Sequence, residues 1–139
     1  MYTGIKRTGK KELQTGSVLD AFSISYLKTT FTAGEVLGGQ RLVKSEGNQV
    51  FYFNPNDADA FKQIGITHQA ALTGKPIEVI TEGVYENSGF SFTPDTVYYA
   101  ASNGLFTSVI PTTGVLLRIG YTINATTIKI DISEPFFLI

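Results

Sequence analysis

The stretch RIGYTINATTIKIDI, residues 118–132, decides the fold class of this chain. Apolar and polar residues alternate along much of it, which is the period of a β-strand that buries one face. With the residues just before it, the stretch predicts two strands, over residues 115–123 and 126–132. It contains no group that is typical of a catalytic site.

The same strand-like pattern extends back along the chain, in short apolar segments separated by Gly, Pro and Asn. These segments are residues 17–34, 41–44, 49–53, 63–70, 77–86, 90–92, 96–101 and 104–109. The turn at residues 46–48 predicts a hairpin, and Asn54 or Asn56 is expected to cap a single helical turn over Asp57–Phe61. No long helical period occurs. The predicted fold class is therefore all-β: a small barrel or sandwich of short antiparallel strands, in one domain over residues 18–139.

Composition agrees with a small β-protein. The 139 residues are 42% hydrophobic and 17% charged, and they include 14 Gly and no Cys. The absence of Cys excludes a disulfide framework and a thiolate site. No stretch has the roughly 18 apolar residues of a membrane span, and the N-terminus lacks the apolar core of a secretory signal. We therefore expect no membrane partner.

Residues 1–17 are polar, Gly-rich and without period, so they predict an extended N-terminal arm. Residues 1–12 carry a net charge of +3 (four basic residues and one acidic), although the whole chain has −1. The basic residues of this candidate docking arm are Lys6, Arg7, Lys10 and Lys11. Such an arm could dock on an acidic surface, and a solvated, frayed terminus is the alternative.

An internal repeat connects the two halves of the sequence. Residues 31–70 align without gaps onto residues 86–125 at an offset of 55, with seven identities in forty positions. The matches fall on apolar strand positions and turn residues, and they include Gly65 with Gly120. This favours one supersecondary unit used twice, in two similar halves. Coincidence in a chain rich in Gly and Thr is the alternative.

Groups that carry chemistry are sparse. His68 is the single histidine, and one His without Cys cannot form the usual zinc site. A structural role for His68 is favoured over a general base. The oxygen-rich residues 54–59 lack the Gly and Glu of a calcium loop, and no phosphate-binding Gly loop occurs. The sequence predicts no catalytic residue, metal site or cofactor, and hence no enzyme.

The aromatic residues are clustered, and the C-terminus is apolar throughout. Exposed Tyr side chains could stack on sugars or bases, but nucleic-acid binding would need basic residues among them, and these are almost absent. At the end of the chain, adjacent apolar residues cannot all lie beneath one sheet face, so we expect an oligomer interface there. Its residues are Phe136, Phe137, Leu138 and Ile139.

The segment TVYYAASNGLFTSVIPTTGVLLRIGYTINATTIKIDI, residues 96–132, resembles a pattern of tailed-phage virion proteins, found in capsid decoration proteins, head fibres and distal fibre domains. AGEVLGGQRLV (33–43) and IGITHQAALTGKPIEVITEGV (64–84) are similar to the capsid-cement pattern. The motifs are short, and together they cover residues 31–132. The family has no catalytic residues to transfer.

The resemblance implies a structural virion protein that decorates or projects from the capsid, stabilising the shell or mediating adhesion. It would be made in the bacterial cytoplasm and lie on the capsid surface, with the major capsid protein or another virion protein as its partner. A homotrimer is expected because shells offer three-fold positions. The alternative is a tail-tip or fibre module that binds a carbohydrate receptor, such as a host-surface glycan.

Overall fold

The computed structural model describes residues 24–138, of which strands hold 49% and helix 6%. The all-β class predicted from the sequence is thus confirmed. The strands are β1 Ser25–Ala33, β2 Leu42–Glu46, β3 Gln49–Tyr52, β4 Ile64–Thr67, β5 Pro76–Glu86, β6 Val97–Ala100, β7 Phe106–Thr107, β8 Val115–Leu116, β9 Arg118–Asn124, β10 Thr127–Ile130 and β11 Phe136–Phe137. The helices are α1, Asp57–Ala60, and the 3-10 turn η1, Ser102–Gly104. The predicted N-terminal arm, residues 1–17, lies outside the described residues.

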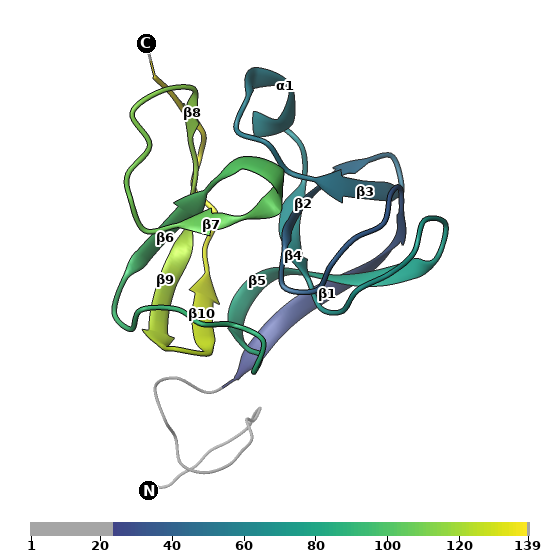
Figure 1. Cartoon of the computed structure of the whole chain (residues 1–139), viewed down its shortest axis with the longest axis horizontal. Coiled ribbons are helices and arrows are strands. Elements are labelled where there is room, and N and C mark those ends of the chain that lie inside the picture. The colour runs from purple at the N-terminus through teal and green to yellow at the C-terminus, as the bar shows by residue number, and fades with distance from the viewer. Residues whose placement is uncertain (1–23, 139) are drawn as a thin grey trace, which may run out of the picture.

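Five strands close into a small ring on the right of Figure 1. β1 pairs with β3 in parallel and with β5 antiparallel, so the order β1-β3-β2-β4-β5 returns to β1. β2 and β3 form the hairpin that the sequence predicted, and because Glu46 pairs with Gln49, the turn is shorter by one residue than the predicted 46–48. The smaller of two core clusters draws on the strands of this ring and includes Val43, Val50 and Ile77.

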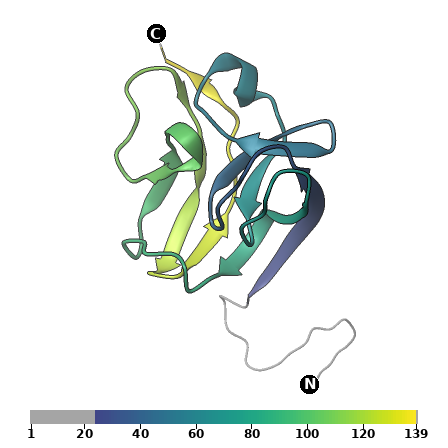
Figure 2. The same ribbon diagram turned by 45° about the vertical axis from the view of Figure 1, so that its right-hand side comes forward.

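The second half of the chain extends the sheet from β5 through β10, β9 and β6 to β7 (Figure 1). The eleven-residue β5 joins the two halves, because one of its edges pairs with β1 over Pro76–Val84 and the other edge pairs first with β4 and then with β10. Gly83 lies where β5 changes partners. Its φ of +106° suits glycine, and a Cβ there would meet the backbone of Ser25 and Tyr26. Figure 2, turned by 45°, shows the two halves side by side.

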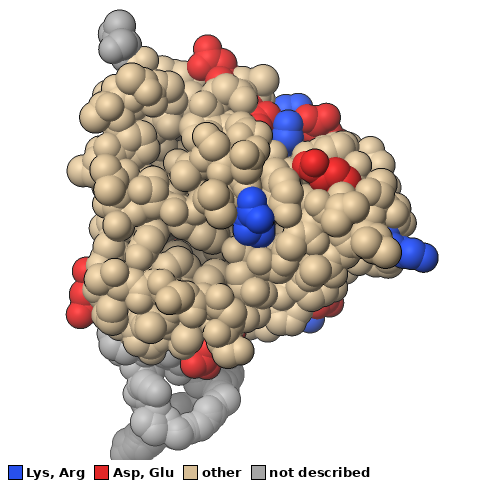
Figure 3. All heavy atoms as spheres, viewed as in Figure 1, with Lys and Arg blue, Asp and Glu red and all other residues tan. Residues whose placement is uncertain are grey.

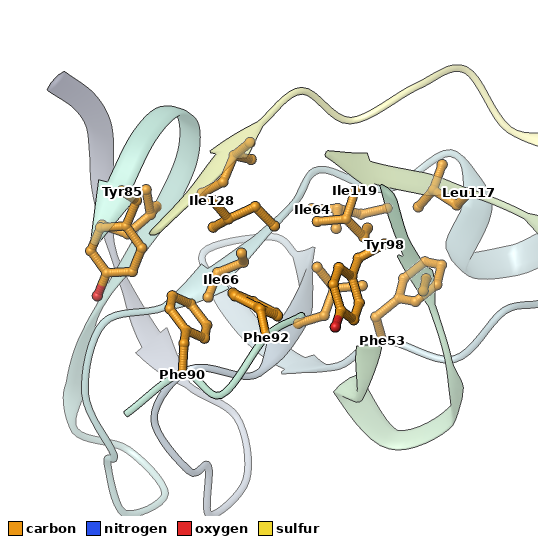
Figure 4. Packing of buried hydrophobic residues seen from close by; sticks show 14 residues of the cluster. Phe53, Ile64, Ile66, Tyr85, Phe90, Phe92, Tyr98, Leu117, Ile119 and Ile128 are labelled. Atoms are coloured by element: carbon orange, nitrogen blue, oxygen red, sulfur yellow. The ribbon is translucent and has the colours of Figure 1, made fainter. Parts of the chain in front are cut away.

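The main core lies between the two halves (Figure 4). Leu42 of β2 belongs to this cluster, whereas the next residue, Val43, belongs to the smaller one. Because successive side chains of a strand point to opposite faces, β2 is buried on both sides. Phe90 and Phe92 stack at 4.5 Å between ring centroids, and Tyr98 packs 4.8 Å from Phe92. The same cluster draws on β2 and β4 of the first half and on β6, β9 and β10 of the second, so a shared core joins the two halves.

Strand pairing follows the same offset of 55 residues in both halves. In β2 and β4, Val43 is paired with Gly65; in β6 and β9, Tyr98 is paired with Gly120. The pairs differ beyond this point, because a bulge between Tyr98 and Tyr99 shifts the register of β6 against β9. The two glycines thus occupy corresponding positions on corresponding strands.

Two expectations about individual strands are wrong. Residues 90–92 form no strand, although aromatic residues alternate there. The amide of Phe90 donates to Asn87 and that of Phe92 to Ala125, so this backbone is used in loop contacts. The predicted strand over residues 115–123 is divided into β8 and β9 at Leu117, which is buried in the main core.

Candidate interaction surfaces

A capped helical turn holds Phe61 at the surface. Asn56 lies at the N-cap of α1, and its side-chain oxygen accepts a hydrogen bond from the amide of Asp59 at 2.9 Å. This selects Asn56 from the two caps that the sequence allowed. Asp59 is buried and accepts a bond from the amide of Asn54 at 3.0 Å. The chain leaves this fixed turn at Phe61, whose side chain is 75% exposed.

An ion pair anchors α1 to the ring of strands. Lys44 of β2 donates to Asp59 at 2.8 Å and to Glu46 at 2.8 Å. Burial alone would lower the pKa of Lys44, but the hydrogen bonds to Asp59 and Glu46 outweigh it, so the pKa is raised. The hydrogen bond from Lys44 also lowers the pKa of Glu46. The charged form of Lys44 is therefore the one that this structure favours.

Two of the four predicted interface residues, Phe136 and Phe137, form the short strand β11 and have exposed side chains. β11 pairs antiparallel with β8, Phe136 opposite Leu116 and Phe137 opposite Val115. The exposed fractions are 63% for Phe136 and 42% for Phe137. Leu138 is partly buried, and its amide donates to the carbonyl of Gly114 at 2.8 Å. The fourth predicted residue, Ile139, lies outside the described residues.

Phe61 and Phe137 come together from distant parts of the chain. Their ring centroids are 5.6 Å apart, with the ring planes tilted by 40°. A shallow groove of about 430 Å³ lies between Pro55 and the loop after β7. Val109 and Ile110 line this groove and are 74% and 57% exposed. We call the region that carries Phe61, Phe136 and Phe137 the apolar end.

The apolar end belongs to the half of the molecule with few charges. In Figure 3 all visible Lys and Arg side chains lie in the centre and on the right, whereas the surface at the upper left is almost entirely uncharged. Among residues 87–138 only five are charged: Asp95, Arg118, Lys129, Asp131 and Glu134. Arg118 and Asp131 pair with each other at 3.3 Å. The proposed docking residues Lys6, Arg7, Lys10 and Lys11 lie outside the described residues.

His68 lies in a structural hydrogen-bond network. Its Nδ1 is 2.7 Å from the hydroxyl of Tyr85, which also accepts a bond from the side chain of Asn87 at 2.9 Å. Tyr85 is buried, and this burial raises its pKa above the ordinary value. Within residues 24–138, no three His, Cys, Asp or Glu side chains come together as ligands for a metal ion.

A second hollow, of about 500 Å³, lies where β4 and β10 diverge along one edge of β5. Its charged side chains include both signs: Lys62 and Lys129 against Glu82 and Asp131. Because these charges have both signs and no group converges on one point, the lining indicates no particular class of ligand for this hollow.

Comparison with protein-family models, curated proteins and solved structures finds no match to this chain. Among the helices of the described residues, none is long and apolar enough to cross a bilayer. Any functional assignment therefore rests on the surface itself and on the resemblance of the sequence motifs.

Sequence reasoning identified Phe136 and Phe137 but did not identify Phe61 as the neighbour of Phe137. Adjacent apolar residues at the C-terminus cannot all point to the buried face of a strand, and this pattern predicted exposed apolar side chains there. Phe61 was assigned to the end of a helical turn, where an apolar residue is equally typical of a core contact. Only its position beside Phe137 identifies it as part of the apolar end.

Proposed function

We propose that this chain is a structural protein of a tailed-phage virion, which decorates or projects from the capsid and works by adhesion. The observation that carries the proposal is the apolar end, where exposed Phe rings stand on a rigid β-scaffold. Large apolar side chains exposed together mark protein–protein contacts. The motif resemblance supplies the virion context, with the major capsid protein or another virion protein as the partner.

A homotrimer is the proposed form of the protein on the particle. Shells present three-fold positions, and an oligomer multiplies weak contacts with the shell by raising the effective concentration of each. The basic arm with Lys6, Arg7, Lys10 and Lys11 is proposed to add contacts with an acidic shell surface. This contact would weaken with salt, because exposed charges are screened.

The test is the location and copy number of the chain on purified particles. Quantitative mass spectrometry is expected to find hundreds of copies per particle, and a cryo-EM map is expected to place them on the capsid surface. Absence from the particles would exclude a virion role. As a second step, removal of residues 1–16 is expected to weaken rebinding to stripped particles, more strongly at low salt, where exposed charges are least screened. Full occupancy across salt concentrations would exclude docking by the arm.

A receptor-binding module at a tail tip or fibre is the second candidate. The observation that favours it is an exposed pair on the outer face of β6 and β9, where Tyr121, 44% exposed, lies opposite Val97. An exposed Tyr ring can stack on a sugar. A handful of copies per particle, together with glycan-array binding that is lost in Tyr121→Ala, would favour this candidate over capsid decoration.

A further inference from the structure

We propose that a cavity between the two halves binds an acidic sugar, whose carboxylate pairs with Arg41. The cavity has a volume of about 370 Å³ and lies where the loop before β2, the loop before β6 and the segment leading into β7 meet. Phe90, Phe92 and Tyr98 of the main core form part of its wall (Figure 4). This inference goes beyond the proposed function, because it assigns a ligand to the isolated protein. The receptor candidate above rests on Tyr121 instead.

Arg41 carries the only charge among the described residues that line this cavity. None of the ion pairs among residues 24–138 includes Arg41. Its Nε is buried without a hydrogen-bond partner, and its Nη2 donates to the carbonyl of Asn103. No carboxylate of the described residues therefore balances the guanidinium charge. A cation in this position favours an anionic ligand, and a carboxylate matches the planar fork of guanidinium donors.

The guanidinium of Arg41 is held in place before any ligand binds. Its Cζ lies 4.3 Å from the centroid of the Tyr52 ring, and the hydroxyl of Tyr52 accepts a hydrogen bond from the amide of Gly38 at 2.8 Å. The ring and the carbonyl of Asn103 together fix the plane of the guanidinium. Because the side chain is already ordered, binding of a carboxylate costs it little conformational entropy.

The second half of the molecule shows that this turn does not require an Arg side chain. Thr96 occupies the position of Arg41 at the offset of 55 residues. The amide of Arg41 donates to the hydroxyl of Thr67 at 3.0 Å, and that of Thr96 donates to the hydroxyl of Thr122 at 3.1 Å. The same backbone contact thus forms with either residue. The guanidinium is an addition to the first half, where it borders the cavity.

The rim of the cavity suits the body of a sugar acid. Leu105 and Phe106 offer apolar surface, against which the C–H groups of a sugar ring can pack. Ser91 is exposed and Leu105 is 50% exposed, so one side of a bound ligand remains in water. The hydroxyl groups of a sugar are hydrated on that side, whereas an aromatic acid would leave apolar surface there. These features favour an acidic sugar over an aromatic acid.

The experiment is an NMR titration of the isotope-labelled full chain with small molecules that differ in one feature each. Glucuronate and N-acetylneuraminate are acidic sugars, and glucose has a hydroxymethyl group where glucuronate has its carboxylate. Acetate tests the carboxylate alone, and benzoate tests an aromatic acid. At least one acidic sugar is expected to shift the resonances of Arg41 and Ser91 saturably. Its dissociation constant is expected to be about tenfold or more below those of glucose, acetate and benzoate.

Arg41→Thr places in the first half the residue that the second half has at this turn. It is expected to weaken binding of the acidic sugar by about tenfold or more, because a charge-assisted pair is lost. Arg118→Thr is the matched control, since it removes the same charge from a residue that pairs with Asp131. Leu105→Glu adds a negative charge to the rim and is expected to weaken binding by a similar factor, whereas Leu72→Glu, at another exposed Leu, is expected to leave it unchanged.

The spectrum of each variant shows whether it is folded, and Leu105→Glu provides the test alone if Arg41→Thr is not. Failure of both acidic sugars to bind would overturn the proposal. Binding of glucose, acetate or benzoate as tight as that of the acidic sugars would also overturn it, as would equal weakening by Arg41→Thr and Arg118→Thr.

Discussion

Thr67 and Thr122, 55 residues apart, make the same hydrogen bonds in the two halves of the molecule. The hydroxyl of Thr67 donates to the carbonyl of Gly38 at 2.8 Å and accepts from the amide of Arg41 at 3.0 Å. The hydroxyl of Thr122 donates to the carbonyl of Thr93 at 2.6 Å and accepts from the amide of Thr96 at 3.1 Å. The partners lie 29 and 26 residues earlier in both cases.

The backbone near these two Thr residues also corresponds. The amide of Gln40 donates to the carbonyl of Thr67, and that of Asp95 to the carbonyl of Thr122. Gln40 and Asp95 both have a positive φ, at 55° and 53°, which is uncommon for residues other than glycine. Each buried Thr thus fixes a strained turn against the strand that carries it.

The substitutions Thr67→Val and Thr122→Val are expected to destabilise the protein by similar amounts. Valine preserves the shape of threonine but removes two part-buried hydrogen bonds, each worth about 0.5–1.5 kcal/mol. Urea denaturation followed by circular dichroism gives the free energy of unfolding. Thr29→Val, at an exposed position of β1, is the control and should change it by less than about 0.5 kcal/mol. If only one of the two substitutions lowers the free energy of unfolding, Thr67 and Thr122 do not have equivalent roles.

The substitutions Gly65→Ala and Gly120→Ala are expected to cost about 1–3 kcal/mol or more, because each strand has a backbone neighbour where the Cβ would lie. At Gly65 the Cβ would be 2.7 Å from the carbonyl oxygen of Ile80, and at Gly120 it would overlap that of Lys129. Gly38→Ala is the matched control, since its nearest neighbour would be 3.6 Å away. Thermal melting compares the three variants, and equal melting temperatures would contradict the expected overlap.

Tyr85→Phe is expected to reduce the loss of stability at alkaline pH. The pKa of Tyr85 is raised above 10.0 by burial, so the unfolded chain releases this proton first. Its contribution to stability is present below the unfolded pKa and is lost as pH rises through the folded pKa. The measurement compares the free energy of unfolding at about pH 8 and about pH 11 in the wild-type protein and the variant. Because the other tyrosines affect both proteins alike, the difference between the two losses reports on Tyr85. An unchanged alkaline loss in the variant would exclude Tyr85 as a source.

Asp59→Asn is expected to destabilise the protein by about 2–3 kcal/mol, because it removes the buried carboxylate that pairs with Lys44. Asp57→Asn, an exposed change in the same helical turn, is the control for charge alone. If Asp57→Asn proves as costly as Asp59→Asn, the ion pair is not the anchor of α1.

Much of the local structure followed from the sequence. The turn at residues 46–48, the capped helical turn and the strand-like segments all depend on neighbouring residues, so their chemistry is visible in the sequence. The alternation of aromatic and polar residues predicted a strand at Phe90 and Phe92 that does not form, because alternate aromatic side chains can be buried without a strand. The candidate surface was predicted at Phe136 and Phe137 for an equally local reason: adjacent apolar residues cannot share one face.

The sequence by itself determined the all-β class, the positions of most turns and the exposure of the C-terminal Phe residues, because these depend on side-chain periodicity and turn chemistry over a few residues. The tertiary structure decided that β1 closes a ring by pairing with both β3 and β5, that β5 pairs with strands of both halves, and that Phe61 meets Phe137. These contacts join distant segments, and pairing between them depends on the packing of two cores rather than on any local pattern.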